Sequence, residues 1–512
     1  MRFWVFSILA LLAIGDAGAC PIPGDSVFTH GFELGSGVYR YVSAGAANNS
    51  GDGSYAQPWK TIQYAADHVS AGDTVCVRGG TYSEILAPTH FGSPTAGVVT
   101  LRNMPGETPI IDGTSFASVP NGQWGLLTLS NPHDIVVRGF ELRNFITSST
   151  AQVPIGLYVT GAGGNIALVG NHVHDIRNNG NGCAANAFGI KVDGTQAPDS
   201  IHDLVISGNE VDHLVLGCSE SFSLDGNVEH WRLDHNTVHD TNNIAIGAIG
   251  FETVAPQAAY DQARDGEIVD NLIYNISSFG NPAYGNQYAA DGIYVDGGTR
   301  IVIERNRIHH VDIGVEVASE HSGQTSSNST VRNNLVYLCN VSGVSIGGYA
   351  NGVGGTTGVD IVGNTLFHND TTNSGSGEIQ IQYHATANRI ANNLVVGSSQ
   401  GVMLYSFVGG ADPAALDYNL YFSSAGSNAL WTWKGNDSTG FANFKTNSSQ
   451  EGHGAFADPL LANTATPDLH VLTGSPAINH GTDLGVAVCG ILDAQNAARV
   501  QGLGIDIGAY EQ

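Results

Sequence analysis

The chain contains little positive charge. Lys and Arg account for 19 of its 512 residues and Asp and Glu for 46, so the formal net charge is −27. A protein that binds nucleic acid needs the opposite sign to meet the phosphate backbone, and we therefore expect no nucleic-acid partner. All charged residues make up only 13% of the chain, whereas glycine, at 67 residues, is nearly twice as frequent as the usual ~7%. This combination disfavours a coiled coil or a helix-rich protein.

Long apolar runs are also missing beyond the N-terminus. There, Phe3–Ile14 follows Arg2 and precedes a group of small residues. Such a run is too short to cross a bilayer, and the pattern is typical of a cleaved signal peptide. We predict a signal peptide over 1–19, no transmembrane segment, and a secreted or cell-surface protein. Cys20 stands at the cleavage point, which leaves a lipid anchor open as the alternative to ordinary cleavage.

A repeat dominates the rest of the sequence. A short apolar strand followed by an asparagine turn recurs every 26 to 38 residues. A second alternating strand follows most of these turns, as in GIKVDG and GIYVDGG, and no helical pattern lies between them. A unit this small cannot bury its own apolar face, so successive units must stack into a solenoid. The nine repeated asparagines are Asn171, Asn209, Asn236, Asn271, Asn306, Asn334, Asn364, Asn393 and Asn419.

Alternation of inward and outward residues on each coil predicts an all-β fold, a parallel β-helix, over residues 39–415. We expect the asparagines to form a ladder that bonds to the backbone of the turns, in the left-handed conformation that asparagine tolerates. An amphipathic helix at 61–69 would cap the N-terminal end and hide its unpaired strand edge. Residues 20–38 are expected to form a linker, and 416–512 the last coils and a C-terminal cap.

Two segments carry a resemblance to a known superfamily. The opening YVSAGAANNSGDGSYAQPWKTIQYAADHVSAGDTVCVRGGTYSE (41–84) resembles the N-terminal signature of secreted right-handed parallel β-helix proteins of the pectate-lyase-like superfamily. The endings GSPAINHG and DIGAYE resemble those of the same exported bacterial proteins. The resemblance implies a right-handed β-helix with an N-terminal capping helix. It does not choose an activity, because this fold carries lyases, hydrolases, epimerases and non-catalytic adhesins.

Alignment of the coils on their inward apolar residues places carboxylates on one outward face and assigns Ala245 and Met403 to the outward row that contains Lys191 and Glu316. Asp296 and Glu316 fall on neighbouring coils, about 8 Å apart from a strand spacing of ~4.8 Å and an offset of two residues. A separation of this size suits an inverting glycoside hydrolase, in which one carboxyl is the acid and the other activates water. Glu316, flanked by Tyr294 and Tyr349, is the expected acid. The expected substrate is a polysaccharide, bound by Tyr294, Glu320, Tyr349, Gln380, Gln382 and His384.

Two other functions remain open. Lys191 with Asp193 and Asp225 matches a calcium-dependent lyase, because many pectate-lyase-like enzymes bind calcium through clustered aspartates and use a Lys or Arg to take the α-proton. Calcium prefers six to eight oxygen ligands, so the two aspartates are only part of a site. The third function is a glycan-binding or adhesive surface protein without turnover. We expect a monomer, with no cofactor certain and calcium as the metal of the lyase alternative.

Six cysteines allow up to three disulfides in an oxidising compartment. Cys183 and Cys218 follow their asparagines at comparable turns of neighbouring coils, and we predict a disulfide between them. Cys76, Cys339 and Cys489 have no assignable partner, and a buried free thiol is the default expectation for them.

Overall fold

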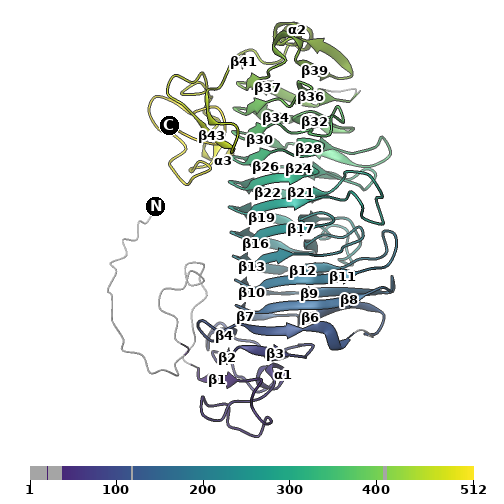
Figure 1. Ribbon diagram of the computed structural model, residues 1–512, viewed down its shortest axis with the longest axis vertical. Coiled ribbons are helices and arrows are strands. Elements are labelled where there is room, and N and C mark those ends of the chain that lie inside the picture. The colour runs from purple at the N-terminus through teal and green to yellow at the C-terminus, as the bar shows by residue number, and fades with distance from the viewer. Residues whose placement is uncertain (1–19, 21–36, 117–118, 408–411) are drawn as a thin grey trace.

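The computed structural model describes residues 20, 37–116, 119–407 and 412–512. The predicted signal peptide and nearly all of the predicted linker lie outside the described residues. Three long sheets run the length of the molecule, and within each sheet a strand pairs in parallel with the equivalent strand of the next coil (Figure 1). The predicted right-handed parallel β-helix is confirmed.

The first sheet contains β1 (Tyr39–Val42), β2 (Thr74–Val77), β4 (Val99–Asn103), β7 (His133–Arg138), β10 (Gly163–Val169), β13 (Ile201–Ser207), β16 (Glu229–Asp234), β19 (Arg264–Val269), β22 (Thr299–Glu304), β25 (Thr325–Ser327), β26 (Thr330–Arg332), β29 (Gly355–Thr357), β30 (Asp360–Val362), β33 (Ala385–Thr386), β34 (Asn388–Ala391) and β37 (Ala414–Asp417). The second contains β3 (Gly80–Tyr82), β5 (Pro109–Asp112), β8 (Glu141–Thr147), β11 (His172–Asn178), β14 (Glu210–Asp212), β17 (Thr237–Thr241), β20 (Leu272–Ile276), β23 (Arg307–Val311), β27 (Leu335–Tyr337), β31 (Thr365–Phe367), β35 (Leu394–Val396), β38 (Leu420–Phe422) and β41 (Ala455–Phe456). The third contains β6 (Gly122–Ser130), β9 (Gln152–Gly161), β12 (Phe188–Gly194), β15 (Phe222–Gly226), β18 (Ile246–Ile249), β21 (Asp291–Asp296), β24 (Ile313–Ala318), β28 (Ser342–Gly347), β32 (Ile379–Ile381), β36 (Val402–Ser406), β39 (Leu430–Trp433) and β40 (Asn436–Thr439).

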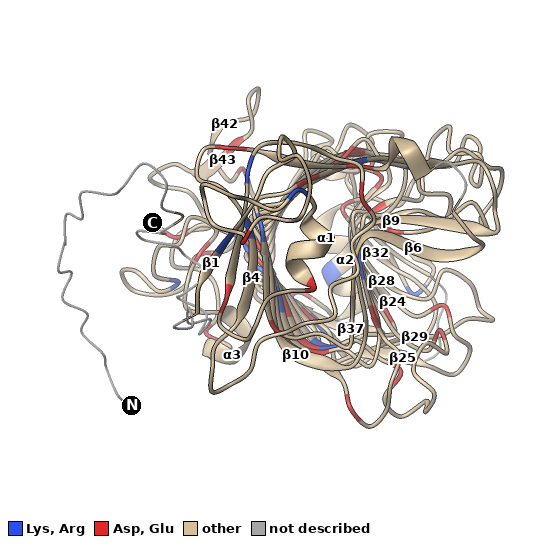
Figure 2. Cartoon of the chain, turned by 90° about the horizontal axis from the view of Figure 1, so that it is seen from below, with Lys and Arg blue, Asp and Glu red and all other residues tan. Residues whose placement is uncertain are grey.

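The described helices are short: α1 (Ile62–Ala66), α2 (Phe441–Ser448), α3 (Val486–Cys489) and the 3-10 turns η2 (Gly113–Phe116) and η3 (Gly426–Asn428). Helix α1 falls within the predicted segment 61–69 and buries Ile62, Ala65 and Ala66 against the core. In the view along the axis it lies between β4 and β6 (Figure 2). Its role as a cap remains a prediction. None of the helices in the described ranges has the length and apolar character needed to span a bilayer.

The asparagine ladder is present at all nine predicted positions. Each asparagine donates its backbone N–H and its Nδ2 to the Oδ1 of the next, as between Asn171 and Asn209 (2.9 and 3.1 Å). The ladder ends at Glu451, whose carboxylate accepts both donors of Asn419. The expected conformation was wrong in one respect, because the left-handed φ belongs to the residue before each asparagine, such as Gly170 (59°) and Asp270 (57°).

The lumen between the sheets is filled by apolar side chains that form one continuous core. Two coils of the third sheet pair two residues away from the register expected from sequence. Gly247 takes the outward place expected for Ala245, which is instead buried in the core, and Tyr405 takes the place expected for Met403. Met403 is also buried in the core. Within the paired strands, a shift of two residues leaves the alternation of inward and outward side chains unchanged, so apolar alternation cannot detect it.

The C-terminal segment divides into two parts. Helix α2 lies at the far end of the solenoid, where Phe444 stacks on Trp431 with ring centroids 5.6 Å apart (Figure 1). The following chain, with β42 (Leu461–Asn463) and β43 (Asp468–Val471), turns back and packs its Leu469 and Ile507 against the outward face of the second sheet. The side of the solenoid is therefore covered there by the chain itself.

The structure joins Cys183 to Cys218 by a disulfide, with Cα atoms 4.7 Å apart. A second disulfide joins Cys20 to Cys76, so the default expectation of a free thiol was wrong for Cys76. Cys339 and Cys489 are free and buried. Because one sulfur cannot carry both a disulfide and a lipid, the Cys20 pairing and the anchor considered above are mutually exclusive.

Candidate functional site

The outward face of the third sheet gathers the predicted site residues. Because side chains alternate between the two faces of a strand, residues paired across neighbouring strands form outward rows. Asp193 and Asp225 are direct neighbours, whereas Asp296 and Glu316 lie one strand and two residues apart. One row runs through Lys191, Ser223, Gly247, Tyr294, Glu316, Ser345, Gln380 and Tyr405.

Polar groups surround Glu316 on β24. Ser345 Oγ donates to its Oε1 at 3.2 Å, and Gln382 also hydrogen-bonds this carboxyl. Burial raises the pKa of Glu316 to about 7, while the bonds from Ser345 and Asp291 oppose the rise. Burial and the adjoining Glu316 charge hold the pKa of Asp291 well above its ordinary value. At neutral pH Asp291 therefore stays protonated, and its hydroxyl donates a hydrogen bond to Glu316.

Asp296 lies at the end of β21, and its Oδ1 accepts the backbone N–H of Glu320 at 2.8 Å. Glu320 in turn accepts the hydroxyl proton of Tyr294 at 3.0 Å. Burial raises the pKa of Asp296 to about 8; the Glu320 N–H opposes this rise and the Glu320 carboxylate adds to it. Burial thus raises the pKa of both carboxyls, and side-chain hydrogen bonds from Ser345 and Gln382 favour the ionised form of Glu316. The sequence-based expectation that Glu316 is the acid stays a prediction.

Lys191 is fixed as the partner of Asp193. Its Nζ donates to Asp193 Oδ2 and to Gln123 Oε1, both at 2.8 Å, and lies 4.8 Å from the ring centroid of Phe188. Tyr158 donates its hydroxyl to the same aspartate oxygen at 2.8 Å. Lys191 Nζ is therefore already engaged by two side-chain oxygens.

Two more carboxyls lie beyond Lys191. Burial raises the pKa of Asp225 to about 7, and the charge of Asp193 adds to the rise. Burial also raises the pKa of Glu220 to about 8, with a further contribution from Asp225. Glu220 fills the space over Gly247, where a Cβ atom would lie 2.8 Å from its Cγ. The face is therefore a series of desolvated carboxyl groups with one lysine near its end.

Sequence reasoning missed the residues that loops bring to this face. Glu220 precedes β15 and Glu252 follows β18, and both therefore lie outside the aligned strands. Tyr284 comes from the long connection before β21, and burial raises its pKa to about 12. Potential metal-ligand atoms of Glu252, Asp296 and His321 lie within 4.8 Å of one another. For Glu252 and Tyr284 the only sequence signal was the length of the connections that carry them, 250–263 and 277–290.

The remaining predicted substrate-binding residues are more dispersed. Gln380 and Gln382 lie two coils beyond Glu316 and are joined by a hydrogen bond of 3.0 Å. Tyr349 follows β28 and is 59% exposed, and His384 hydrogen-bonds a loop carbonyl at 2.9 Å. The structure thus places Tyr294 and Glu320 beside the carboxylates, and Tyr349 and His384 on connections outside the strands.

Asp193 and Asp225 fit part of a calcium shell. The Oδ1 atoms of both are buried and have no hydrogen-bond partner within the described ranges. Paired, unsatisfied carboxylate oxygens suit a hard cation, but calcium takes six to eight oxygen ligands. The two residues would therefore need further ligands from the substrate or solvent.

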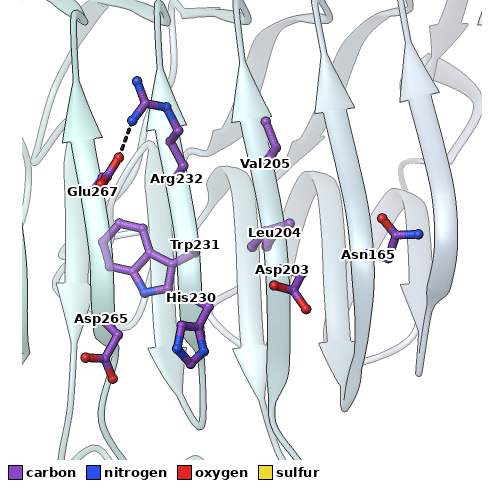
Figure 3. A pocket seen from close by; sticks show the side chains of 9 residues that line it. All are labelled: Asn165, Asp203, Leu204, Val205, His230, Trp231, Arg232, Asp265 and Glu267. Carbon is purple, nitrogen blue, oxygen red and sulfur yellow. Dashed lines mark hydrogen bonds and ion pairs between the residues drawn. The ribbon is translucent and has the colours of Figure 1, made fainter. Parts of the chain in front are cut away.

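The first sheet has a separate pocket of about 460 Å³ (Figure 3). Two of its carboxylates face arginines: Arg232 pairs with Glu267 on the neighbouring strand, and Arg300 Nε donates to Asp265 at 2.6 Å. The third, Asp203, pairs with His202. The hydrogen bond from Arg300 lowers the pKa of Asp265. Asp265 is therefore an ion-paired carboxylate, unlike the buried carboxyls of the third sheet.

A relative covers almost the whole chain. The uncharacterized protein YwoF of Bacillus subtilis (strain 168) is 33% identical over 477 residues, which span 93% of this chain and 99% of that protein. The chain belongs to the YwoF family. No protein-family model matches the sequence.

The other similarities of this YwoF-family chain are more limited. Pectate lyase PEL9 of Emericella nidulans is 30% identical over 127 residues, which span 24% of this chain and 30% of that protein. Among solved structures, pectate lyase Pel9A matches with a TM-score of 0.48 and 13% identity, covering 94% of this chain and 98% of that chain. XylC in complex with xylose matches with a TM-score of 0.47 and 13% identity, covering 92% and 98%.

Proposed function

We propose that the protein is an exported enzyme that hydrolyses a polysaccharide on the outward face of the third sheet. One observation carries the proposal: Asp296 and Glu316, on neighbouring strands, have pKa values raised by burial to about 8 and about 7. Both carboxyls therefore keep a proton nearer to neutral pH than ordinary acids do, and the side-chain hydrogen bonds to Glu316 favour its ionised form. General acid and base catalysis needs such a pair.

Asp296 is the general acid and protonates the oxygen of the leaving sugar. Glu316 is the general base and takes a proton from the attacking water. Their offset of one strand and two residues corresponds to about 8 Å, within the ~6.5–9.5 Å of inverting enzymes. Asp291 positions Glu316 through the shared hydrogen bond, and Glu320 holds Asp296 through its backbone N–H.

Charge and disulfides support the proposed substrate and location. With a net charge of −27, the protein repels a polyanion, so an uncharged glycan is the favoured substrate. Two disulfides in the described part of the chain support export to an oxidising compartment.

A calcium-dependent lyase is the second candidate. The unsatisfied Oδ1 atoms of Asp193 and Asp225 and the local similarity to pectate lyase PEL9 favour it. Bound calcium would neutralise the carboxylate of a uronate and so acidify its α-proton. Lys191 would take that proton, but it would first have to leave Asp193, and this requirement places the lyase second.

The test is a panel of neutral and uronic polysaccharides, scored for new reducing ends and for the ultraviolet absorbance of an unsaturated sugar. Hydrolysis predicts reducing ends without absorbance and a bell-shaped pH dependence of kcat/KM with limbs near pH 7 and 8. Asp296→Asn should lower the rate by about 10²- to 10⁴-fold, whereas Lys191→Met should retain activity.

Two outcomes contradict the hydrolase. Absorbance that a chelator abolishes, together with an inactive Lys191→Met variant, identifies the lyase. Binding of a glycan without any cleavage across the panel identifies the non-catalytic protein considered from sequence.

A further inference from the structure

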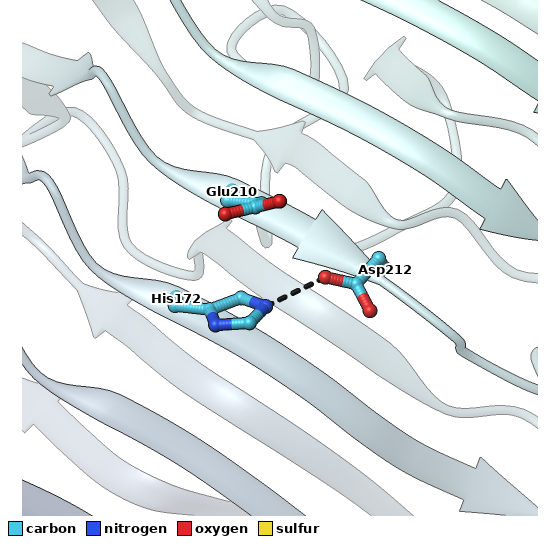
Figure 4. A group of neighbouring side chains, drawn as sticks. All are labelled: His172, Glu210 and Asp212. Carbon is cyan, nitrogen blue, oxygen red and sulfur yellow. Dashed lines mark hydrogen bonds and ion pairs between the residues drawn. The ribbon is translucent and has the colours of Figure 1, made fainter.

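A second cluster of functional groups lies on the outward face of the second sheet, away from the carboxylates of the proposed catalytic site. It draws on three consecutive strands, β11, β14 and β17. His172 pairs across the strands with Glu210, and Asp212 pairs with His239. The four side chains therefore occupy adjoining places on one face (Figure 4 shows three of them).

The donor atoms of this cluster converge. Potential ligand atoms of His172, Glu210 and Asp212 all lie within 4.8 Å of one another. His172 Nε2 is 2.6 Å from Asp212 Oδ2, and His239 Nε2 lies 3.2 Å from Glu210 Oε1 and 3.9 Å from Asp212 Oδ2. His172, Glu210 and Asp212 thus converge on one small volume, and His239 Nε2 adjoins both carboxylates.

The orientation of His239 is fixed from outside the cluster. Its Nδ1 lies 2.7 Å from Asp240 Oδ2, and its ring stacks on Tyr274 with centroids 4.8 Å apart and an interplanar angle of 4°. When Nδ1 donates to Asp240, Nε2 directs its lone pair toward Glu210 and Asp212. A carboxylate behind a histidine is the usual arrangement that orients a metal-bound imidazole.

The two carboxylates of the cluster favour positive charge beside them. With both histidines neutral, Nε2 of His239 and two carboxylates present only acceptors to one another, and the set carries two negative charges. Either protons on the histidines or a divalent ion relieves this repulsion. A divalent ion balances the charge completely and keeps both imidazoles in the neutral form.

We propose that His172, Glu210, Asp212 and His239 form a binding site for a divalent transition metal of the zinc type. Two imidazole nitrogens and two carboxylate oxygens match the ligands and the coordination number of zinc, and imidazole disfavours calcium and magnesium. The ion would link three consecutive coils and stabilise the folded solenoid, because it binds the folded chain and finds no preformed site in the unfolded one.

The experiment uses the exported chain with its disulfides intact, stripped with chelator, dialysed and titrated with Zn²⁺ by calorimetry, with thermal unfolding measured in parallel. We expect one equivalent of Zn²⁺ to bind at this cluster and to raise Tm. His172→Gln and Glu210→Gln should each weaken this binding at least tenfold and remove the rise in Tm. Asp240→Asn should weaken it by about 10- to 100-fold through the orientation of His239.

Two control variants separate this site from other ligands. His202→Gln removes a histidine on the first sheet that also faces an aspartate, Asp203, at 2.7 Å, and it should leave Zn²⁺ binding unchanged. His321→Gln removes the histidine of the catalytic face and should also leave this equivalent in place. The proposal is overturned if Zn²⁺ does not bind, or if binding survives His172→Gln and Glu210→Gln. Loss of binding in His321→Gln would place the ion on the catalytic face instead.

Discussion

Carboxylates on the outward faces of the second and third sheets have pKa values displaced in opposite directions. Asp212 on the second sheet and Asp225 on the third are almost equally covered, with 5% and 7% of their surface exposed. Burial would raise both, yet hydrogen bonds from His172 and His213 bring the pKa of Asp212 down to about 2, whereas that of Asp225 rises to about 7. Two causes differ: Asp225 lies deeper in the protein and beside further carboxylates, whereas histidines hydrogen-bond Asp212.

This contrast separates structural charges from reactive ones. A buried acid that has a cationic partner is ionised and adds stability, while a buried acid among other acids holds a proton near neutral pH. On the third sheet the described cation is Lys191, and Asp193 already engages it. The remaining carboxyls of that face are therefore available for proton transfer.

The largest expected effect is on catalysis. Glu316→Gln should lower kcat by about 10²- to 10⁴-fold, or about 2.7 to 5.5 kcal/mol, because an amide cannot accept the proton of water. Glu210→Gln, the same substitution on the second sheet, should leave kcat unchanged. Equal losses in both variants would show that the two faces do not differ in the way proposed.

The next effect concerns stability at high pH. Glu220 has a folded pKa of about 8 against an ordinary value of 4.5, so its ionisation destabilises the fold increasingly from about pH 4.5 to pH 8. Glu220→Gln should therefore be more stable than the wild type at pH 9, by on the order of 4 kcal/mol, and equal to it near pH 5. Urea unfolding at the two pH values measures the difference, and a destabilised variant at pH 9 would contradict the assignment.

Asp212→Asn should change stability in the opposite direction and destabilise the fold. The folded pKa of Asp212 is about 2 and its ordinary value is 3.8, so its contribution is present above pH 3.8 and is lost as the pH falls through about 2. We expect a loss of about 1–2 kcal/mol at pH 7 in the presence of chelator, measured by urea unfolding. A variant as stable as the wild type at pH 7 would mean that the histidines do not stabilise this carboxylate.

The smallest effect is expected for Tyr294→Phe. The change removes one hydroxyl hydrogen bond to Glu320 and should cost about 0.5–1.5 kcal/mol of stability. Since Asp296 is held by the backbone of Glu320 and not by its side chain, kcat should change much less than in Glu316→Gln. A loss of activity as large as that of Glu316→Gln would make Tyr294 part of the proton transfer.

Much of the fold could be predicted from the sequence because the repeat is local. Apolar alternation and the asparagine period define the coils, and the Cys183–Cys218 pairing follows from their equivalent turns. Register within a coil could not be predicted, since a slip of two residues, as at Gly247, leaves the alternation intact. Asp296 and Glu316 were found because they belong to aligned strands.

The other site residues on the second and third sheets could not be predicted, because contacts between coils bring them together. Glu220 and Glu252 come from connections that have no repeat to align. His172 and His239 showed no metal-site spacing along the chain, because stacking of separate coils brings them together. Which of Asp296 and Glu316 is the acid depends on individual hydrogen bonds, and strand patterns do not encode them.

The asparagine ladder has a direction. Each step donates toward the C-terminal end, from the backbone N–H of Phe140, which the Oδ1 of Asn171 accepts, to the carboxylate of Glu451. An interior coil with its asparagine can be added or removed by duplication or deletion without leaving an unmatched donor. Glu451 cannot be lost in this way, because the two donors of Asn419 would then have no acceptor. As a carboxylate it accepts hydrogen bonds and donates none, so it fits only the final place in the ladder. The length of the solenoid can therefore change during evolution, while the polarity of the ladder and its final residue are constrained.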